Sequence, residues 1–461
     1  MDQPLDGQPR NPLGYQPIGK LLPKFAIPSI ISFLVSAMYN IVDQIFIGQG
    51  VGQLGNAATT VAFPLVTICT ALALLLGVGS ASNFNLRMGE GRQEEAQRIA
   101  GTGLSAIVIF GFSLAVLVML FLRPLLLLFG ATSNNLPYAL LYTRITALGY
   151  PLVIFSTASS QLIRADGSPT YSMTCQISGA VLNTVLDYIF VFPMGMGMAG
   201  AAWATVLGQL LAAVLALRYF FYFHSFPITA QLLRPRLSYL RAIASLGAAA
   251  CFNQLAMMVV QITMNNVLKY YGGLSIYGED IPLACVGVIT KVNTILMGIL
   301  IGTAQGCQPI VGFNYGAKNY PRVRKTYLTG VTFATAVSVA AFLCFQIFPR
   351  YIVSIFGQGS EEYYHFAEQY FRIFLFMTFL NGLQPLTSNF FTSIGKAKMG
   401  IFISMTRQII FLLPLILLFP MLWGIDGVMY AGPIADLAAG ILAVVLIVRE
   451  MRIMDRLSLP Q

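Results

Sequence analysis

Residues 89–98 read GEGRQEEAQR, and residues 316–325 read GAKNYPRVRK, a related segment in the second half of the chain. Further pairs recur at the same separation, to within one residue: FG at 129–130 and 356–357, YTRI at 142–145 and YFRI at 370–373, ADGSPT at 165–170 and SIGKAK at 393–398, and GMAGAAWA at 197–204 and GIDGVMYA at 424–431. A single match of this kind could arise by chance. Five at a common separation indicate that the chain contains a duplicated unit.

The composition is typical of a protein that crosses a membrane several times. Hydrophobic residues make up 57% of the chain and charged residues 10%, whereas an ordinary soluble domain has about 25% charged residues. Apolar stretches near the ~20 residues of a transmembrane helix recur throughout the chain. There are twelve, at residues 21–47, 57–84, 99–122, 137–163, 171–192, 199–223, 240–269, 282–312, 327–348, 363–391, 400–422 and 428–449.

Each copy of the duplicated unit therefore holds six spans. Because six is an even number, both copies begin on the same side of the membrane, and such parallel repeats are related by an axis along the membrane normal. We predict an all-α polytopic membrane protein of two pseudo-symmetric six-helix bundles. The N-terminal lobe is expected at 21–223 and the C-terminal lobe at 240–450, with a cytoplasmic linker at 224–239 and cytoplasmic ends at 1–20 and 451–461.

The distribution of basic residues predicts the orientation in the membrane. Twenty Lys and Arg residues lie near the span ends on the side that holds both termini, and three lie on the other side. Since cytoplasmic loops are enriched in Lys and Arg, both termini are expected in the cytoplasm and the protein in the plasma or inner membrane. The same enrichment explains the net charge of +10. No basic helix or interleaved aromatic patch suggests a nucleic-acid partner.

Polar side chains within the first lobe are the leading candidates for a functional site. A carboxylate at the bilayer centre costs about 2.5–3.5 kcal/mol, so acids inside a membrane indicate function. Asp43 and Asp187 lie about 8 and 9 Å from the expected outer ends of their spans. Asn183 shares a helix face with Asp187, and Asn40 shares one with Asp43, because these pairs are four and three residues apart. Thr205 lies at a similar depth in the sixth span.

This group predicts an ion site that is confined to one lobe. The repeat places Leu415 opposite Asp187, and the seventh span has no acid near the position that matches Asp43. Carboxylate, amide and hydroxyl oxygens suit a hard cation such as Na⁺, and paired carboxylates can hold a proton. We therefore expect coupling to H⁺ or Na⁺, with Na⁺ held, in the second case, by Asp43, Asn183, Asp187 and Thr205.

Three charged residues within the spans of the second lobe are candidates for lining a substrate cavity. Lys291 and Arg407 have apolar or small counterparts across the repeat, so they are not shared features of both lobes. Asp436 corresponds to Gln209, which favours a polar contact between helices and makes this acid the weaker candidate.

The sequence resembles the MATE (multidrug and toxic compound extrusion) transporters over about residues 20–450, most closely the MepA-like and DinF-like branches. The segments that carry the resemblance are MYNIVDQIFIG at 38–48, NAA at 56–58, ADGSP at 165–169 and QGCQPIVGFNYGAK at 305–318. The resemblance implies a cation-coupled antiporter built from two six-helix bundles.

The resemblance also implies roles for four residues. In DinF-like members, an acid on helix one, an N-x-x-x-D motif on helix five and a threonine on helix six form a cation or proton site. These positions match Asp43, Asn183 and Asp187, and Thr205. The sequence departs from the NorM-like pattern of acids on helices seven and ten, since span seven has no acid. The resemblance therefore gives no support to an ion site in the second lobe.

These observations favour a secondary active antiporter that exports amphipathic, cationic small molecules by alternating access in exchange for H⁺ or Na⁺. The expected partners are these substrates, the coupling ion and membrane lipids, with no bound cofactor and a monomeric chain. Lys291 and Arg407 leave an anionic or zwitterionic substrate open. A flippase for lipid-linked sugars is the alternative within the same fold. A membrane-embedded enzyme is disfavoured because the only histidines, His224 and His365, lie near span ends.

Overall fold

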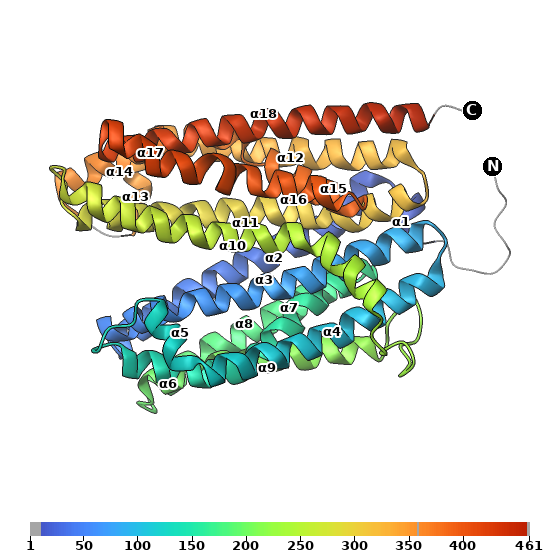
Figure 1. The fold of residues 1–461 in the computed structure, drawn as a ribbon, viewed down its shortest axis with the longest axis horizontal. Coiled ribbons are helices and arrows are strands. Elements are labelled where there is room, and N and C mark those ends of the chain that lie inside the picture. The colour runs from blue at the N-terminus through green and yellow to red at the C-terminus, as the bar shows by residue number, and fades with distance from the viewer. Residues whose placement is uncertain (1–10, 357–358, 459–461) are drawn as a thin grey trace.

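The computed structural model describes residues 11–356 and 359–458, and this part of the chain is helical without a β-strand. Two lobes lie side by side (Figure 1). The first contains α2 (Ile18–Gly50), α3 (Gln53–Gly89), α4 (Gln93–Leu120), α5 (Leu122–Leu128), α6 (Leu136–Leu148), α7 (Tyr150–Ala165), α8 (Pro169–Val191) and α9 (Gly197–Phe220), preceded by the short α1 (Pro12–Tyr15). The second contains α10 (Leu237–Gly273), α11 (Asp280–Gly316), α12 (Tyr320–Ile347), α13 (Pro349–Ile355), α14 (Glu361–Phe374), the 3₁₀ turn η1 (Thr378–Leu380), α15 (Leu383–Ser393), α16 (Ala397–Met405), the π-helical η2 (Thr406–Leu412), α17 (Leu413–Trp423) and α18 (Ile425–Leu457).

The described helices account for the predicted spans. Ten are long and apolar enough to cross a membrane, and the pair α6–α7, bent by 51°, adds an eleventh span. The remaining predicted span, 363–391, is divided among α14, η1 and α15, which explains why no single long helix represents it. The two interrupted spans occupy equivalent places in the two lobes. The predicted all-α architecture of two six-helix bundles is confirmed.

The duplication is visible in the lengths of the helices. Helices α3 and α11 both have 37 residues, α4 and α12 both have 28, and α5 and α13 both have 7. In each of these three pairs the two helices begin at the same separation along the chain as the paired sequence motifs. The separation read from short motifs is therefore the separation of whole structural units.

Glycines on α11 allow α2 of the first lobe to approach very closely. A Cβ atom at Gly302 would lie 2.7 Å from the Cα of Ile30, and one at Gly306 would lie 2.5 Å from the Cα of Ala26. Glycines spaced by four residues lie on one face of a helix and let two backbones pack without intervening side chains. The α2–α11 crossing is thus a backbone-to-backbone contact.

An equivalent crossing joins α3 to α10. A Cβ at Gly79 would lie 2.0 Å from the carbonyl oxygen of Ile243, and one at Gly247 would lie 1.7 Å from that of Leu75. Because α3 and α11 are counterparts, as α10 and α2 are, the two crossings are related by the pseudo-two-fold axis. We call the end of the molecule where α2 begins and α18 ends the terminal end, and the opposite end the distal end (Figure 1). Both crossings lie in the terminal half.

The first turns of α2 also contribute to the core of the second lobe. Leu21 and Phe25 of α2 are buried in the same hydrophobic cluster as Leu300 and Ile310 of α11. The close approach that the α11 glycines permit explains this exchange. The lobes are therefore interlocked at the terminal end.

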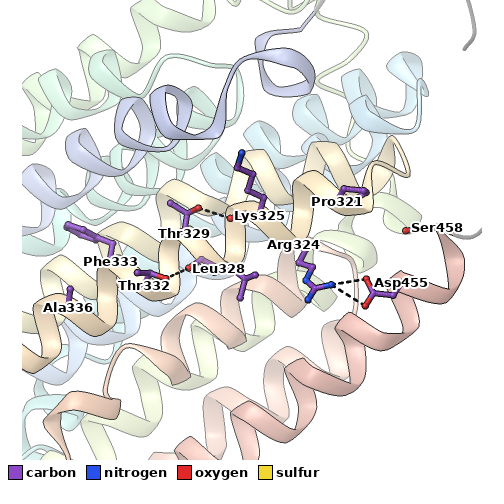
Figure 2. A pocket seen from close by; sticks show the side chains of 10 residues that line it. All are labelled: Pro321, Arg324, Lys325, Leu328, Thr329, Thr332, Phe333, Ala336, Asp455 and Ser458. Carbon is purple, nitrogen blue, oxygen red and sulfur yellow. Dashed lines mark hydrogen bonds and ion pairs between the residues drawn. The ribbon is translucent and has the colours of Figure 1, made fainter.

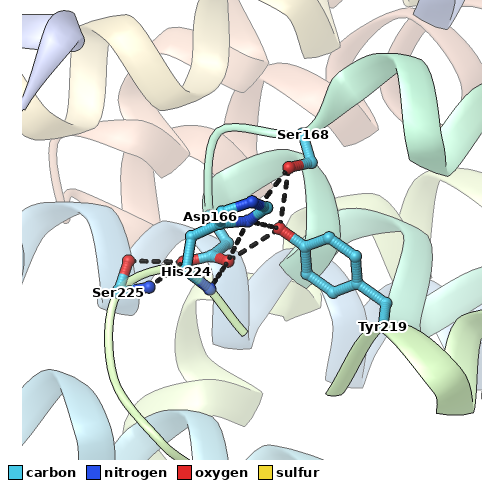
Figure 3. A network of polar contacts seen from close by, with 5 residues as sticks. All are labelled: Asp166, Ser168, Tyr219, His224 and Ser225. Carbon is cyan, nitrogen blue, oxygen red and sulfur yellow. Dashed lines mark hydrogen bonds and ion pairs between the residues drawn. The ribbon is translucent and has the colours of Figure 1, made fainter. Parts of the chain in front are cut away.

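The linker between the lobes is fixed to the first lobe by the loop that contains Asp166 (Figure 3). The Asp166 carboxylate accepts hydrogen bonds from the Tyr219 hydroxyl at 2.7 Å and from the backbone N–H groups of His224 and Ser225 at 2.8 and 3.0 Å. The Tyr219 hydroxyl also lies 2.8 Å from that of Ser168. This network holds the chain where it leaves α9 and turns back over the lobe.

We predict that Gly302→Val destabilises the protein by separating α2 from α11. The new side chain would meet the backbone of Ile30, and overpacking of this kind costs about 1–3 kcal/mol. Thermal unfolding in detergent should show a lower Tm. Gly287→Val is the matched control on the same helix, because nothing beyond the adjoining backbone of α11 lies within 4 Å of its Cβ position. Equal Tm values for the two variants would contradict the proposed role of the crossing.

Candidate functional site

Two helices of the first lobe, α2 and α8, bring the two predicted acids together. They pack side by side in the same direction towards the distal end. Phe46 contacts Tyr188 and Phe192, with ring centroids 6.2 and 5.7 Å apart. Gly50 lies against Val191, so closely that a Cβ at residue 50 would be 2.1 Å from the Val191 side chain. This register places Asp43 beside Asp187.

The two carboxyl groups form a buried pair. Asp187 has no exposed surface and Asp43 is 8% exposed. The two side chains lie close enough to interact electrostatically. No donor among the described residues bonds either oxygen of Asp187 or Oδ1 of Asp43. Two adjacent buried carboxylates repel each other, so the pair is stable when a proton or a cation lies between them.

Asn183 and Thr205 form the next layer of the site. The Asn183 amide donates to the Thr205 hydroxyl at 3.2 Å, and that hydroxyl donates to the Ala201 carbonyl at 3.1 Å. In the described structure the buried Oδ1 of Asn183 accepts no hydrogen bond. An oxygen acceptor without a donor therefore lies one helical turn before Asp187 on the same helix face.

Asn40 lies apart from this group. Its side chain is exposed, and its amide donates to the Ser36 carbonyl of its own helix at 2.8 Å. Side chains three residues apart lie on neighbouring sides of a helix. Here the Asp43 side chain is buried and the Asn40 side chain is exposed. The structure thus joins Asp43 to Asp187 and Asn183 to Thr205, and leaves Asn40 outside.

Two tyrosines near the acid pair were not among the predicted site residues. Tyr39 and Tyr142 each lie close enough to both acids to interact with them electrostatically. Tyr39 precedes Asp43 by one helical turn, so the spacing in the sequence could have predicted that it lies near this acid. Tyr142 comes from α6 through a motif shared by both lobes, so nothing in its sequence context connects it with this site.

The second lobe has an apolar pair at the position equivalent to the acid pair. In the two glycine crossings, Ile30 on α2 occupies the position that Gly247 occupies on α10, and Ala26 the position of Ile243. The same register along α2 and α10 matches Asp43 with Val260, and the repeat matches Asp187 with Leu415. Val260 belongs to the core of the second lobe, and Leu415 packs against that core. The structure thus keeps the packing in both lobes and places the carboxyl chemistry in one.

The charged candidates of the second lobe do not form one group. Arg407 donates a hydrogen bond to the Asp436 carboxylate, and both side chains are buried. Arg407 lies on the π-helical segment η2, shortly before Pro414 and the start of α17. Lys291 is exposed on α11 and forms no ion pair within the described part of the chain. The polar contact between helices that the sequence favours for Asp436 is therefore present, and its partner is Arg407.

Comparison with known families supports the same architecture. The model of the MatE family matches this chain twice, over residues 28–189 and residues 243–418. Two proteins similar along nearly the whole chain are multidrug export proteins named MepA. The one from Staphylococcus aureus (strain MSSA476) is 23% identical over 443 residues, which are 96% of this chain and 95% of that protein. The one from Staphylococcus haemolyticus is 22% identical over 445 residues, 96% of each chain.

Solved structures show the same fold. A MOP superfamily transporter from Pyrococcus furiosus, described as having a binding pocket of reversed polarity, superposes with a TM-score of 0.89 at 23% identity over 96% of this chain and 98% of that chain. The outward-facing conformation of a multidrug resistance MATE family transporter superposes with a TM-score of 0.88 at 22% identity over 95% and 97%. At these identities, the likeness establishes the arrangement of the helices.

We predict that Asp436→Leu lowers the yield of folded protein because it leaves the Arg407 guanidinium buried without its partner. Breaking a buried ion pair on one side costs about 3–5 kcal/mol. The double variant Arg407→Met with Asp436→Leu should recover most of that yield, measured by size-exclusion chromatography and thermal unfolding. A single variant that folds like the wild type but transports different compounds would instead place the pair in a substrate cavity.

Proposed function

Because this chain belongs to the MatE family of multidrug export transporters, we propose that it is a secondary active antiporter. It exports amphipathic, cationic small molecules and takes up H⁺ or Na⁺ in exchange. The proposal rests on one observation above all: Asp43 and Asp187 lie close enough to interact, and buried oxygens of both accept no hydrogen bond from a donor in the described structure. Such a pair binds a proton or a small cation and releases it when its surroundings change.

Asp43, Asp187, Asn183 and Thr205 supply the oxygens of the proposed coupling site. In the Na⁺ case the two carboxylates and the unbonded Asn183 Oδ1 would act as ligands, with the Thr205 hydroxyl orienting the amide. In the H⁺ case one carboxyl would donate to the other. Burial disfavours a charged carboxylate, whereas exposure to water favours it. A change in access to the pair therefore changes its affinity for the ion, which is the requirement for coupling.

Contacts between the lobes support alternating access. Arg164 donates to Gln305 at 2.5 Å, Gln308 donates to Ser82 at 2.8 Å, and Asn83 donates to the Ala242 carbonyl at 3.0 Å. These bonds join the lobes in the terminal half, which the basic residues predict to be cytoplasmic. In our proposal this conformation is closed towards the cytoplasm, and export requires the same bonds to break and re-form.

Lys291 supports a second substrate class. Helices α2 and α11 run antiparallel, so Gly298, Gly302 and Gly306 lie beside residues of α2 with decreasing numbers. Extending this pairing towards the start of α11 places Lys291 at about the level of Asn40. An exposed cation thus lies on the neighbouring helix near the depth of the acid site. It would favour an anionic or zwitterionic substrate over a cationic one. Competition of cationic and anionic dyes for transport separates these two cases.

The decisive prediction concerns Asp43→Asn and Asp187→Asn, which remove a titrating group with little change in volume. One proton moved by 100 mV and one pH unit gains about 3.7 kcal/mol, which can support a substrate gradient of several hundredfold. In proteoliposomes, an H⁺ gradient and a Na⁺ gradient are imposed separately. We expect either variant to reduce the substrate concentration ratio across the membrane to near unity. The double variant should be little worse than either single, since the two acids act as one unit.

Asn40→Ala is the matched control for this experiment. Its amide bonds only to its own helix among the described residues, so coupled export should be retained. Substrate binding and Tm, measured in detergent, should stay close to wild type in all three variants. Coupled export by Asp43→Asn at the wild-type level would show that the pair is not the coupling site.

A further inference from the structure

A groove on the outside of the second lobe lies apart from the acid site. It has a volume of about 800 Å³ and runs between α12 and the last turns of α18. Its lining residues are Pro321, Arg324, Lys325, Leu328, Thr329, Thr332, Phe333, Ala336, Asp455 and Ser458 (Figure 2). From Arg324 to Ala336 the groove follows α12 for about 18 Å, slightly more than the ~15 Å of one hydrocarbon leaflet. It therefore extends from the terminal end of the molecule into the depth of the bilayer.

The chemistry of the groove changes along its length. Arg324 and Lys325 provide cations at the terminal end, while Leu328, Phe333 and Ala336 make the deeper part apolar. Leu328 and Phe333 are 49% and 46% exposed, so both offer open hydrophobic surface. A ligand that fits both parts has an anionic head and an apolar chain.

The two threonines of the groove do not alter its apolar character. Their hydroxyls donate to carbonyls of the same helix, Thr329 to Lys325 and Thr332 to Leu328, both at 2.8 Å (Figure 2). A hydroxyl that bonds its own helix has its donor satisfied and presents mainly its methyl group to a neighbour. The wall below the cations is thus suited to an acyl chain.

The cations at the rim are available to a ligand. Arg324 pairs with Asp455 at 3.2 and 3.3 Å, but both side chains are about half exposed, and such surface pairs are worth at most about 1 kcal/mol. Lys325 points away from Asp455 (Figure 2) and has no ion-pair partner among the described residues. Arg452 and Arg456 lie on the adjoining face of α18. Basic residues outnumber the single acid of the rim.

The first lobe shows what fills the equivalent surface. Across the repeat, Leu328 and Thr332 correspond to Gly101 and Ser105 of α4. There the inter-lobe linker covers the helix. The Leu232 carbonyl lies 2.0 Å from the Cβ position of Gly101, and the Ser105 hydroxyl donates to the Leu233 carbonyl. The leucines of the linker therefore occupy in the first lobe the place that is open in the second.

The open groove follows from the path of the chain. After α9 ends at Phe220, the linker turns back over α4. The counterpart of Phe220 is residue 447, but α18 continues straight to Leu457. The described segment around Leu13 and Gln16 contacts α12 at Arg322. Leu328 and Phe333 remain exposed, so within the described residues this apolar surface lacks the cover that its counterpart has.

We infer that the groove between α12 and α18 binds an anionic phospholipid, with the phosphodiester at Arg324 and Lys325 and an acyl chain along Leu328, Phe333 and Ala336. The lipid takes the place that Leu232 and its neighbour fill in the first lobe. Basic pockets between membrane helices on the cytoplasmic side are suited to anionic headgroups, and each Lys or Arg near the surface contributes about 1 kcal/mol. The site is independent of the transport function proposed above.

Native mass spectrometry of the full chain in detergent tests this inference. Phosphatidylglycerol and phosphatidylcholine with the same acyl chains are titrated into wild type, into Arg324→Gln with Lys325→Gln, and into Thr332→Trp, which fills the groove without changing its charge. We expect one retained phosphatidylglycerol in the wild type. The double variant should bind it about 30-fold more weakly, which corresponds to about 2 kcal/mol at 1.4 kcal/mol per tenfold change. Thr332→Trp should also lose it.

Arg98→Gln is the matched control, because Arg98 is the counterpart of Lys325 in the lobe that the linker covers. It should bind phosphatidylglycerol like the wild type, and the Tm of each variant shows whether it is folded. Equal retention of phosphatidylcholine, or equal loss in Arg98→Gln, would overturn the inference. Displacement of phosphatidylglycerol by millimolar inorganic phosphate would show a plain anion site and would overturn it as well.

Discussion

The two glycine crossings at the terminal half are the constraint on which the rest of the structure depends. Gly302 and Gly306 bring α11 onto α2, and Gly79 and Gly247 bring α3 onto α10, with no side chains between the backbones. Contacts without interdigitated side chains allow one helix to roll on another. From Ile30 at the crossing to Asp43, α2 runs for about 20 Å. A small rotation at the crossing therefore produces a larger movement at the acid pair.

The duplicated scaffold carries different chemistry in each lobe. Asp43 and Asp187 lie close together in the first lobe, where the second has Val260 and Leu415. In the second lobe, the buried Arg407 and Asp436 form an ion pair and neutralise each other. A neutral pair has no need of an external ion, whereas a pair of acids does. The proposed coupling to a proton or cation therefore involves the first lobe, although both lobes share one packing plan.

The sequence predicted the features that depend on local spacing and missed those that depend on contacts between helices. The repeat, the spans and the similar depth of Asp43 and Asp187 follow from residue counts along one helix. The same reasoning grouped Asn40 with the acids, because spacing gives an angular position but not the neighbour on that side. The pairing of Arg407 with Asp436 and the packing of the first turns of α2 in the other lobe required knowledge of which helices touch.

A chain that joins two equivalent lobes by one linker is asymmetric at the end where the linker lies. The linker must return over one lobe, and here Asp166 and Tyr219 fix it there so that Leu232 covers α4. In the other lobe, Leu328 and Phe333 of α12 are exposed among the described residues. In our proposal, a lipid covers this face of α12 where the linker covers the equivalent face of α4. Cations at its rim then determine which lipids that surface favours.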